Sequence, residues 1–134
     1  MSRFGLNEGK KRTYVVAASQ TILGGANVWE NDAGLLVDDA AAGESAIPVG
    51  MALHDAEGGE VVTVMIDGVG TGLATDAEEF PIGSPLKVNT SDGKWELGVI
   101  DTDLIWGIAR SATTGEDGEY FEVERFATPY PVTA

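Results

Sequence analysis

The chain has 134 residues, which suits one domain, and 43% of them are hydrophobic, enough to bury a core. Its 22 acidic and 8 basic residues give a net charge of −14, which predicts an acidic surface. Nucleic acid and anionic membranes repel such a surface, so neither is an expected partner, and the absence of cysteine excludes disulfides and thiolate sites.

The first 12 residues, MSRFGLNEGKKR, differ in charge from the rest of the chain. They hold four basic residues and one acidic residue, a net +3, so the other 122 residues must carry −17 to reach the total of −14. We predict a basic N-terminal arm at 1–12 ahead of a single β domain at 13–134. Its candidate binding residues are Arg3, Phe4, Leu6, Lys10, Lys11 and Arg12. The alternative is a chain terminus that is basic by chance.

Short apolar runs separated by Gly, Asp, Asn or Pro follow the arm, and each is rich in Val, Ile, Leu or aromatic residues. This spacing predicts an all-β fold, a small compact β-barrel or sandwich. No long window keeps a helical period, and only Asp38–Ala42 and Asp76–Glu79 favour a single helical turn. The expected strands are Thr13–Ala18, Asn27–Glu30, Gly34–Val37, Ile47–Leu53, Glu60–Ile66, Pro85–Asn89, Lys94–Ile100, Leu104–Arg110 and Glu119–Arg125.

The pattern of the first half of the chain returns in the second half. VGMALHDAEGGEVVTV, from Val49, aligns with WGIARSATTGEDGEYFEV, from Trp106, when two residues are added to the second turn. The alignment places Gly50 on Gly107 and predicts two degenerate repeats, at about 20–70 and 78–128. It also aligns Ala52 with Ala109, Val64 with Val123, Gly24 with Gly83, Gly34 with Gly93 and Gly59 with Gly118. The alternative is a chance match between glycine-rich β sequences.

Two of the aligned glycines lie inside expected strands and not in turns. Gly50 and Gly107 each follow an apolar residue in the middle of such a run. A glycine in a strand marks a bulge or a close approach of another backbone. We therefore expect crowding at both positions.

Residues able to do chemistry are few. His54 is the only histidine, so a zinc site or a histidine-dependent catalytic triad is not expected, and no serine has a nucleophile-elbow pattern. The pairs Asp38–Asp39 and Asp101–Asp103 lack the spacing of a calcium loop. We predict no enzyme activity, no cofactor and no metal.

Glycine and tryptophan residues also have simpler interpretations than ligand binding. The GVGTG run at Gly68–Gly72 precedes no helix, so it lacks the context of a dinucleotide fingerprint. Trp29, Trp95 and Trp106 lie in expected strands and favour a core or subunit contact over a stacking platform for sugars or bases.

Three segments in order carry a resemblance to a known family: GGANVWENDAG, then DDAAAGESA, then VGMALHDAEGGEVVTVMIDGVGTG with its second copy. Over roughly Thr13–Val123 the chain resembles the small all-β decoration, or cement, proteins of tailed-virus heads. The shared positions are Gly, Ala and Val, and the family has no catalytic residues to transfer. The strong acidity and the basic arm depart from its pattern, and the acidity is typical of proteins from salty environments, which suggests a halophilic host.

The resemblance implies a virion structural protein made in the host cytoplasm and located on the outer capsid surface. Its expected partners are the major capsid protein and itself, as a homotrimer. The basic charge of the arm, and not the resemblance, makes the arm residues the expected capsid-binding residues. Two other classes stay open on the residues alone. One is a ligand- or carbohydrate-binding module of a tail or spike, and the other is a hydrolase that uses carboxylates. An internal pocket or converging carboxylates would favour these two classes. A filled core with an outer apolar patch would favour the virion structural protein.

Overall fold

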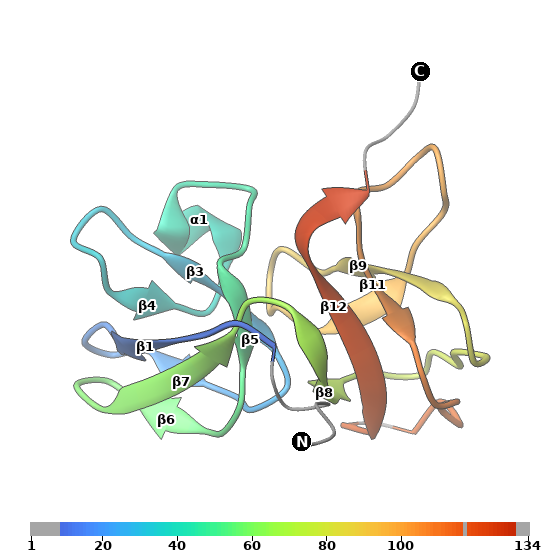
Figure 1. Cartoon of the computed structure of the whole chain (residues 1–134). Coiled ribbons are helices and arrows are strands. Elements are labelled where there is room, and N and C mark those ends of the chain that lie inside the picture. Colours follow the sequence, from blue (N-terminus) through green and yellow to red (C-terminus); the bar gives the residue numbers. More distant parts are fainter. Residues whose placement is uncertain (1–8, 117, 131–134) are drawn as a thin grey trace.

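Two five-stranded antiparallel sheets lie side by side in the computed structural model, which describes residues 9–116 and 118–130 (Figure 1). The first sheet has the order β1-β7-β5-β3-β4. Its strands are β1 (Lys11–Val15), β3 (Asn27–Glu30), β4 (Leu36–Val37), β5 (Gly50–Ala52) and β7 (Val61–Met65).

The second sheet has the order β10-β9-β11-β12-β8 and uses the second half of the chain. Its strands are β8 (Gly68–Leu73), β9 (Pro85–Val88), β10 (Trp95–Leu97), β11 (Ile105–Ala109) and β12 (Tyr120–Tyr130). A small third sheet pairs β2 (Thr21–Ile22) with β6 (Ala56–Glu57). The all-β prediction is confirmed, but in the described residues the sheets do not close into a barrel.

The one helix of the described residues is α1 (Ala40–Gly43), which lies where the sequence predicted a turn of helix at Asp38–Ala42. Asp39 caps it, because its Oδ1 accepts a hydrogen bond of 2.7 Å from the backbone N–H of Ala42. The second predicted turn, Asp76–Glu79, is wrong. Ala77 has φ +64°, a left-handed conformation that a continuing right-handed helix does not contain.

The two sheets are copies of one unit. Read from β1 and from β8, both sheets have the same strand order, so that β1, β7, β5, β3 and β4 correspond to β8, β12, β11, β9 and β10. Ala52 pairs with Val64 in the first unit, and Ala109 pairs with Val123 in the second, as the sequence alignment predicted. We call them the first repeat and the second repeat.

Finer features repeat as well. Val16 forms a parallel bridge with Leu36, and Ala74 forms the same bridge with Trp95. Three pairs of glycines with positive φ also correspond: Gly25 and Gly83, Gly34 and Gly93, Gly59 and Gly118. The alignment of Gly24 with Gly83 is wrong by one residue, because Gly25 and Gly83 make the equivalent hydrogen bonds, to the carbonyls of Ala52 and Ala109.

Both repeats start earlier than the sequence predicted, since β1 and β8 belong to them. Lys11 and Arg12 pair with Met65 and Val64, so these two arm residues belong to the first sheet. The β8 strand was missed altogether: its sequence GVGTGL contains three glycines, which weaken a strand by intrinsic preference.

Two clusters of buried side chains form the core. The larger draws on both repeats and contains all three tryptophans, and the smaller lies within the first repeat. At two neighbouring positions the larger and the smaller residue are interchanged between the repeats. Tyr14 and Leu36 in the first repeat correspond to Gly72 and Trp95 in the second, and a Cβ on Gly72 would lie 2.8 Å from the Trp95 ring. A larger residue opposite a smaller one keeps each repeat densely packed.

The glycines inside strands mark close approaches, as predicted. A Cβ on Gly50 would lie 2.3 Å from Cγ1 of Val64, and one on Gly107 would lie 2.7 Å from the Glu124 carbonyl oxygen. The register of β11 on β12 also shifts between Ile105 and Gly107, which is a bulge.

Candidate binding surface

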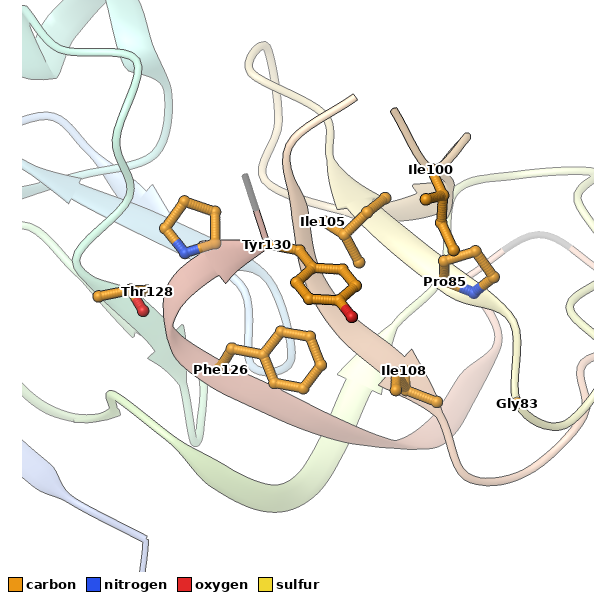
Figure 2. A pocket seen from close by; sticks show the side chains of 9 residues that line it. Gly83, Pro85, Ile100, Ile105, Ile108, Phe126, Thr128 and Tyr130 are labelled. Carbon is orange, nitrogen blue, oxygen red and sulfur yellow. The ribbon is translucent and has the colours of Figure 1, made fainter. Parts of the chain in front are cut away.

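A cavity of about 580 Å³ lies on the face of the second sheet that points away from the core (Figure 2). Because side chains alternate along a strand, Ala109 and Val123 face the core while Ile108 faces the opposite side. Strands β9, β11 and β12 and the loops beside them supply the lining, which consists of Gly83, Pro85, Ile100, Ile105, Ile108, Phe126, Thr128, Pro129 and Tyr130.

None of these lining residues is charged, although the chain carries −14. In Figure 2 the side chains of Tyr130, Phe126, Ile105 and Ile108 gather around one space. Several large apolar side chains in the same part of the chain are exposed: Ile82 (71%), Val99 (59%), Ile100 (54%), Leu104 (40%) and Tyr130 (58%). An apolar region of this kind on a strongly charged protein is typical of a surface that binds another molecule.

Arg125 lies next to the cavity residue Phe126 in β12, with only 1% of its surface exposed. Its Nε donates a 2.8 Å hydrogen bond to Oδ1 of Asn27, and its Nη1 donates to the carbonyl oxygens of Ile66 (2.7 Å) and Phe126 (3.1 Å). The guanidinium also lies 4.9 Å from the centre of the Trp106 ring. Arg125 therefore joins the second repeat to the first.

This arginine is buried without a direct carboxylate partner among the described residues. Burial lowers the pKa of Arg125 to about 10, and the negative charge of Asp67 opposes that shift. Its Nη2 has no hydrogen-bond partner within the described part of the chain. The guanidinium is thus a structural link between the repeats that carries an energetic cost.

The predicted arm residues fall into two groups. Arg3, Phe4 and Leu6 lie outside the described residues, so their role stays a prediction. Lys10, Lys11 and Arg12 are exposed at the start of the first sheet, and the Lys10 backbone N–H donates a 2.7 Å hydrogen bond to Oδ1 of Asp67. The structure places these three away from the group of residues that lines the cavity.

The other polar candidates have local structural roles. His54 is exposed, and its Nδ1 lies 3.0 Å from the Asp55 carbonyl oxygen. Oδ2 of Asp103 accepts a 2.8 Å hydrogen bond from the Val99 N–H and lies 3.8 Å from Nζ of Lys87. Residues 9–116 and 118–130 contain no group of three His, Asp or Glu side chains placed to hold a metal ion. The three tryptophans are buried, as a core role predicts.

Two carboxyl groups have shifted pKa values, both explained by local contacts. Burial raises the pKa of Asp38, and the neighbouring Asp39 adds to the effect. Hydrogen bonds from the backbone N–H groups of Thr114 and its two successors, at 2.9–3.3 Å, lower the pKa of Glu119. Glu119 thereby fixes the loop between β11 and β12, which is a structural task.

Sequence reasoning missed the cavity. Its residues come from three strands and from separate loops, and their common face follows from the strand pairing. The available signal was an apolar residue at some of the outward-facing strand positions of the second repeat, such as Ile108 and Phe126. Without the strand pairing, the sequence does not show that these residues share one face.

No family model matches the sequence, and no curated protein matches it. In fold the chain is similar to a solved structure, that of the N base of the head fiber gp8.5 of bacteriophage phi29. The two chains share 12% sequence identity with a TM-score of 0.57, and the match covers 91% of this chain and 99% of the other. At that identity the likeness shows the fold. Among the described residues, no helix has the length and apolar character needed to cross a membrane.

Proposed function

We propose that the protein is a structural component of a tailed-virus head, which decorates the outer capsid surface and stabilises the shell. The observation that carries this proposal is the similarity in fold to the N base of a phage head fiber, over nearly the whole of both chains. The order of glycine-, alanine- and valine-rich segments resembles head decoration proteins and supports the same role independently of the fold.

The filled core and the outer cavity also favour this role over the two alternatives. Both repeats have densely packed interiors, and the cavity lies on the outer face of the second sheet with an uncharged lining. A hydrolase would need converging carboxylates, which the lining lacks. An apolar outer surface suits assembly on a lattice, where many copies together give strong attachment from modest single contacts.

We assign the capsid contact to the basic residues at the start of the chain, which can pair with carboxylates on the capsid surface. Lys10 and Lys11 are exposed, and they follow Arg3, Phe4 and Leu6 in the sequence. Exposed ion pairs contribute about 0–1 kcal/mol each, so the contact made by a single arm is weak. It adds to attachment because many copies bind the same capsid. The halophilic host stays a prediction, based on the net charge of −14.

The experiment adds the purified protein to capsids assembled from the major capsid protein of the same virus and counts bound copies by electron cryomicroscopy. We expect ordered density on the outer surface and a higher temperature of capsid rupture. Deletion of residues 2–8 combined with Lys10→Glu and Lys11→Glu should lower the occupancy. The matched control, Lys87→Glu with Lys94→Glu, makes the same change in charge elsewhere and should bind normally. Capsids that stay bare with the intact chain would refute the proposed function.

A further inference from the structure

The two repeats contact each other through different faces. The first repeat contributes a surface that we call face A, made of Gly25, Asn27, Met51 and Met65. The second repeat contributes face B, made of Gly70, Leu73 and Gly93. The Leu73 N–H donates to the Gly25 carbonyl oxygen (3.0 Å), and the Asn27 N–H donates to the Gly93 carbonyl oxygen (2.7 Å). A Cβ on Gly70 would lie 3.1 Å from the methyl groups of Met51 and Met65.

Because the repeats are equivalent, each chain has a second face A, on the second repeat. Strand register and hydrogen bonding assign its residues as Gly83, Pro85, Ile108 and Glu124, the counterparts of Gly25, Asn27, Met51 and Met65. All four residues of the first set are buried, whereas none of the second set is. No described residue would lie within 4 Å of a Cβ on Gly83. Gly83, Pro85 and Ile108 line the cavity.

Each chain likewise has a second face B, on the first repeat. Its residues are Arg12, Val15 and Gly34, the counterparts of Gly70, Leu73 and Gly93. Val15 is 42% exposed, whereas Leu73 is 4% exposed. Arg12 is also exposed, and it belongs to β1, an edge strand of the first sheet. One chain therefore presents both halves of the contact that joins its own repeats.

We propose that a second copy of the chain places its Arg12–Val15 edge on the cavity of the first copy, which reproduces the contact between the repeats in a head-to-tail manner. This inference concerns self-association, and it does not depend on the proposed capsid role. Such a contact uses a different surface on each partner, so it leaves one face A and one face B open at the ends of a dimer. Further copies can then join until a ring closes.

Side-chain size and charge support this occupant. Within the chain, Gly70 lies over Met51 and Met65. The equivalent contact between copies brings Arg12 over Ile108 and Glu124, so a cation of one copy meets a carboxylate of the next. Arg110 already contacts that carboxylate, which makes Arg12 a second cation beside it.

The cavity also matches the larger side chain that Arg12 brings to the contact. Arg12 takes the place of Gly70, and the cavity of about 580 Å³ provides the space that its side chain needs. Pro85 replaces Asn27 and has no N–H, so the hydrogen bond to the glycine of the partner has no counterpart. The contact between copies is accordingly more apolar and more easily separated than the internal one.

The first test measures the mass of the full-length protein by sedimentation over a range of concentrations. It is done in about 1 M salt, where the Debye length is about 3 Å and the repulsion between acidic copies is screened. We expect reversible self-association that Ile108→Lys weakens at least ~10-fold, since the substitution puts a cation into the apolar contact and opposite the incoming Arg12. Ile47→Lys, at a position 58% exposed and outside both faces, is the matched control and should associate normally.

The second test determines the direction of the contact. The chain has no cysteine, so Val15→Cys and Gly83→Cys can be made as separate single variants. Within the chain, a Cβ on Gly25 would lie 3.2 Å from the Cβ of Leu73, close to the spacing of a disulfide. We expect oxidation of an equal mixture to join one variant to the other.

Three results would overturn the proposal. A monomer at every concentration in high salt would mean that the capsid or another segment of the chain covers the cavity. Association that is equally weakened by Ile108→Lys and Ile47→Lys would place the contact elsewhere. A disulfide between two Val15→Cys chains, with none to Gly83→Cys, would show a symmetric contact in place of the head-to-tail one.

Discussion

Replacing Arg125 with methionine tests the link between the repeats most directly. Methionine keeps the apolar stem but removes the three hydrogen bonds to Asn27, Ile66 and Phe126 and the contact with the Trp106 ring. It also removes the cost of burying the charge. The lowering of the Arg125 pKa to about 10 corresponds to a cost of roughly 3 kcal/mol.

The lost interactions outweigh the relieved cost. Hydrogen bonds from a charged donor are worth about 1.5–3 kcal/mol each, and a buried cation–π contact is worth about 2 kcal/mol. After the roughly 3 kcal/mol that burial costs is subtracted, we expect Arg125→Met to lower the free energy of unfolding by at least about 3 kcal/mol. The buried Oδ1 of Asn27, left without this donor, adds to the loss.

Urea unfolding followed by tryptophan fluorescence measures the change, because all three tryptophans are buried. The control is Arg110→Met, which removes a half-exposed arginine whose partner is Glu124 and should cost about 0–1 kcal/mol. A double-mutant cycle with Asn27→Leu isolates the coupling between Arg125 and Asn27. The reasoning is refuted if Arg125→Met is no less stable than Arg110→Met.

Three further perturbations test the packing, the loop and the charge. Gly50→Ala should lower the free energy of unfolding in urea by more than about 2 kcal/mol, because its Cβ meets Val64 at 2.3 Å. The control Gly59→Ala has open space around its Cβ and φ +87°, and it should cost about 1–2 kcal/mol. Equal costs for the two variants would contradict the close approach at Gly50. Glu119 has a lowered pKa in the folded protein, so its contribution to stability is complete above the unfolded pKa of 4.5 and is lost as the pH falls through the folded pKa. Glu119→Gln should remove this contribution to the pH dependence of the free energy of unfolding. An unchanged pH profile would contradict the role of Glu119 in fixing the loop. Molar potassium chloride should raise the melting temperature, since it screens repulsion within a chain of net charge −14, and a flat or falling value would count against that view.

Local pattern was sufficient to predict most of the strands and their repetition. Val64 lies in a β-branched run and Val123 in a run with aromatic residues. The glycines at turns, such as Gly59 and Gly118, have the positive φ that only glycine adopts without strain. These features depend on neighbours in sequence and on hairpin geometry. Aligning the two halves of the chain was therefore enough to predict that the two hairpins are equivalent, and Ala52 pairs with Val64 as Ala109 pairs with Val123.

Tertiary structure alone decided how the two repeats contact each other and which of their faces stay exposed. The β8 sequence GVGTGL reads as a loop by intrinsic preference, yet it forms a strand, because small residues there admit Met51 and Trp95. Leu73 and Val15 occupy equivalent positions in the two sheets but differ in burial, since only Leu73 meets the other repeat. Burial of that kind depends on which faces meet across the molecule, and no periodicity within a strand encodes that choice.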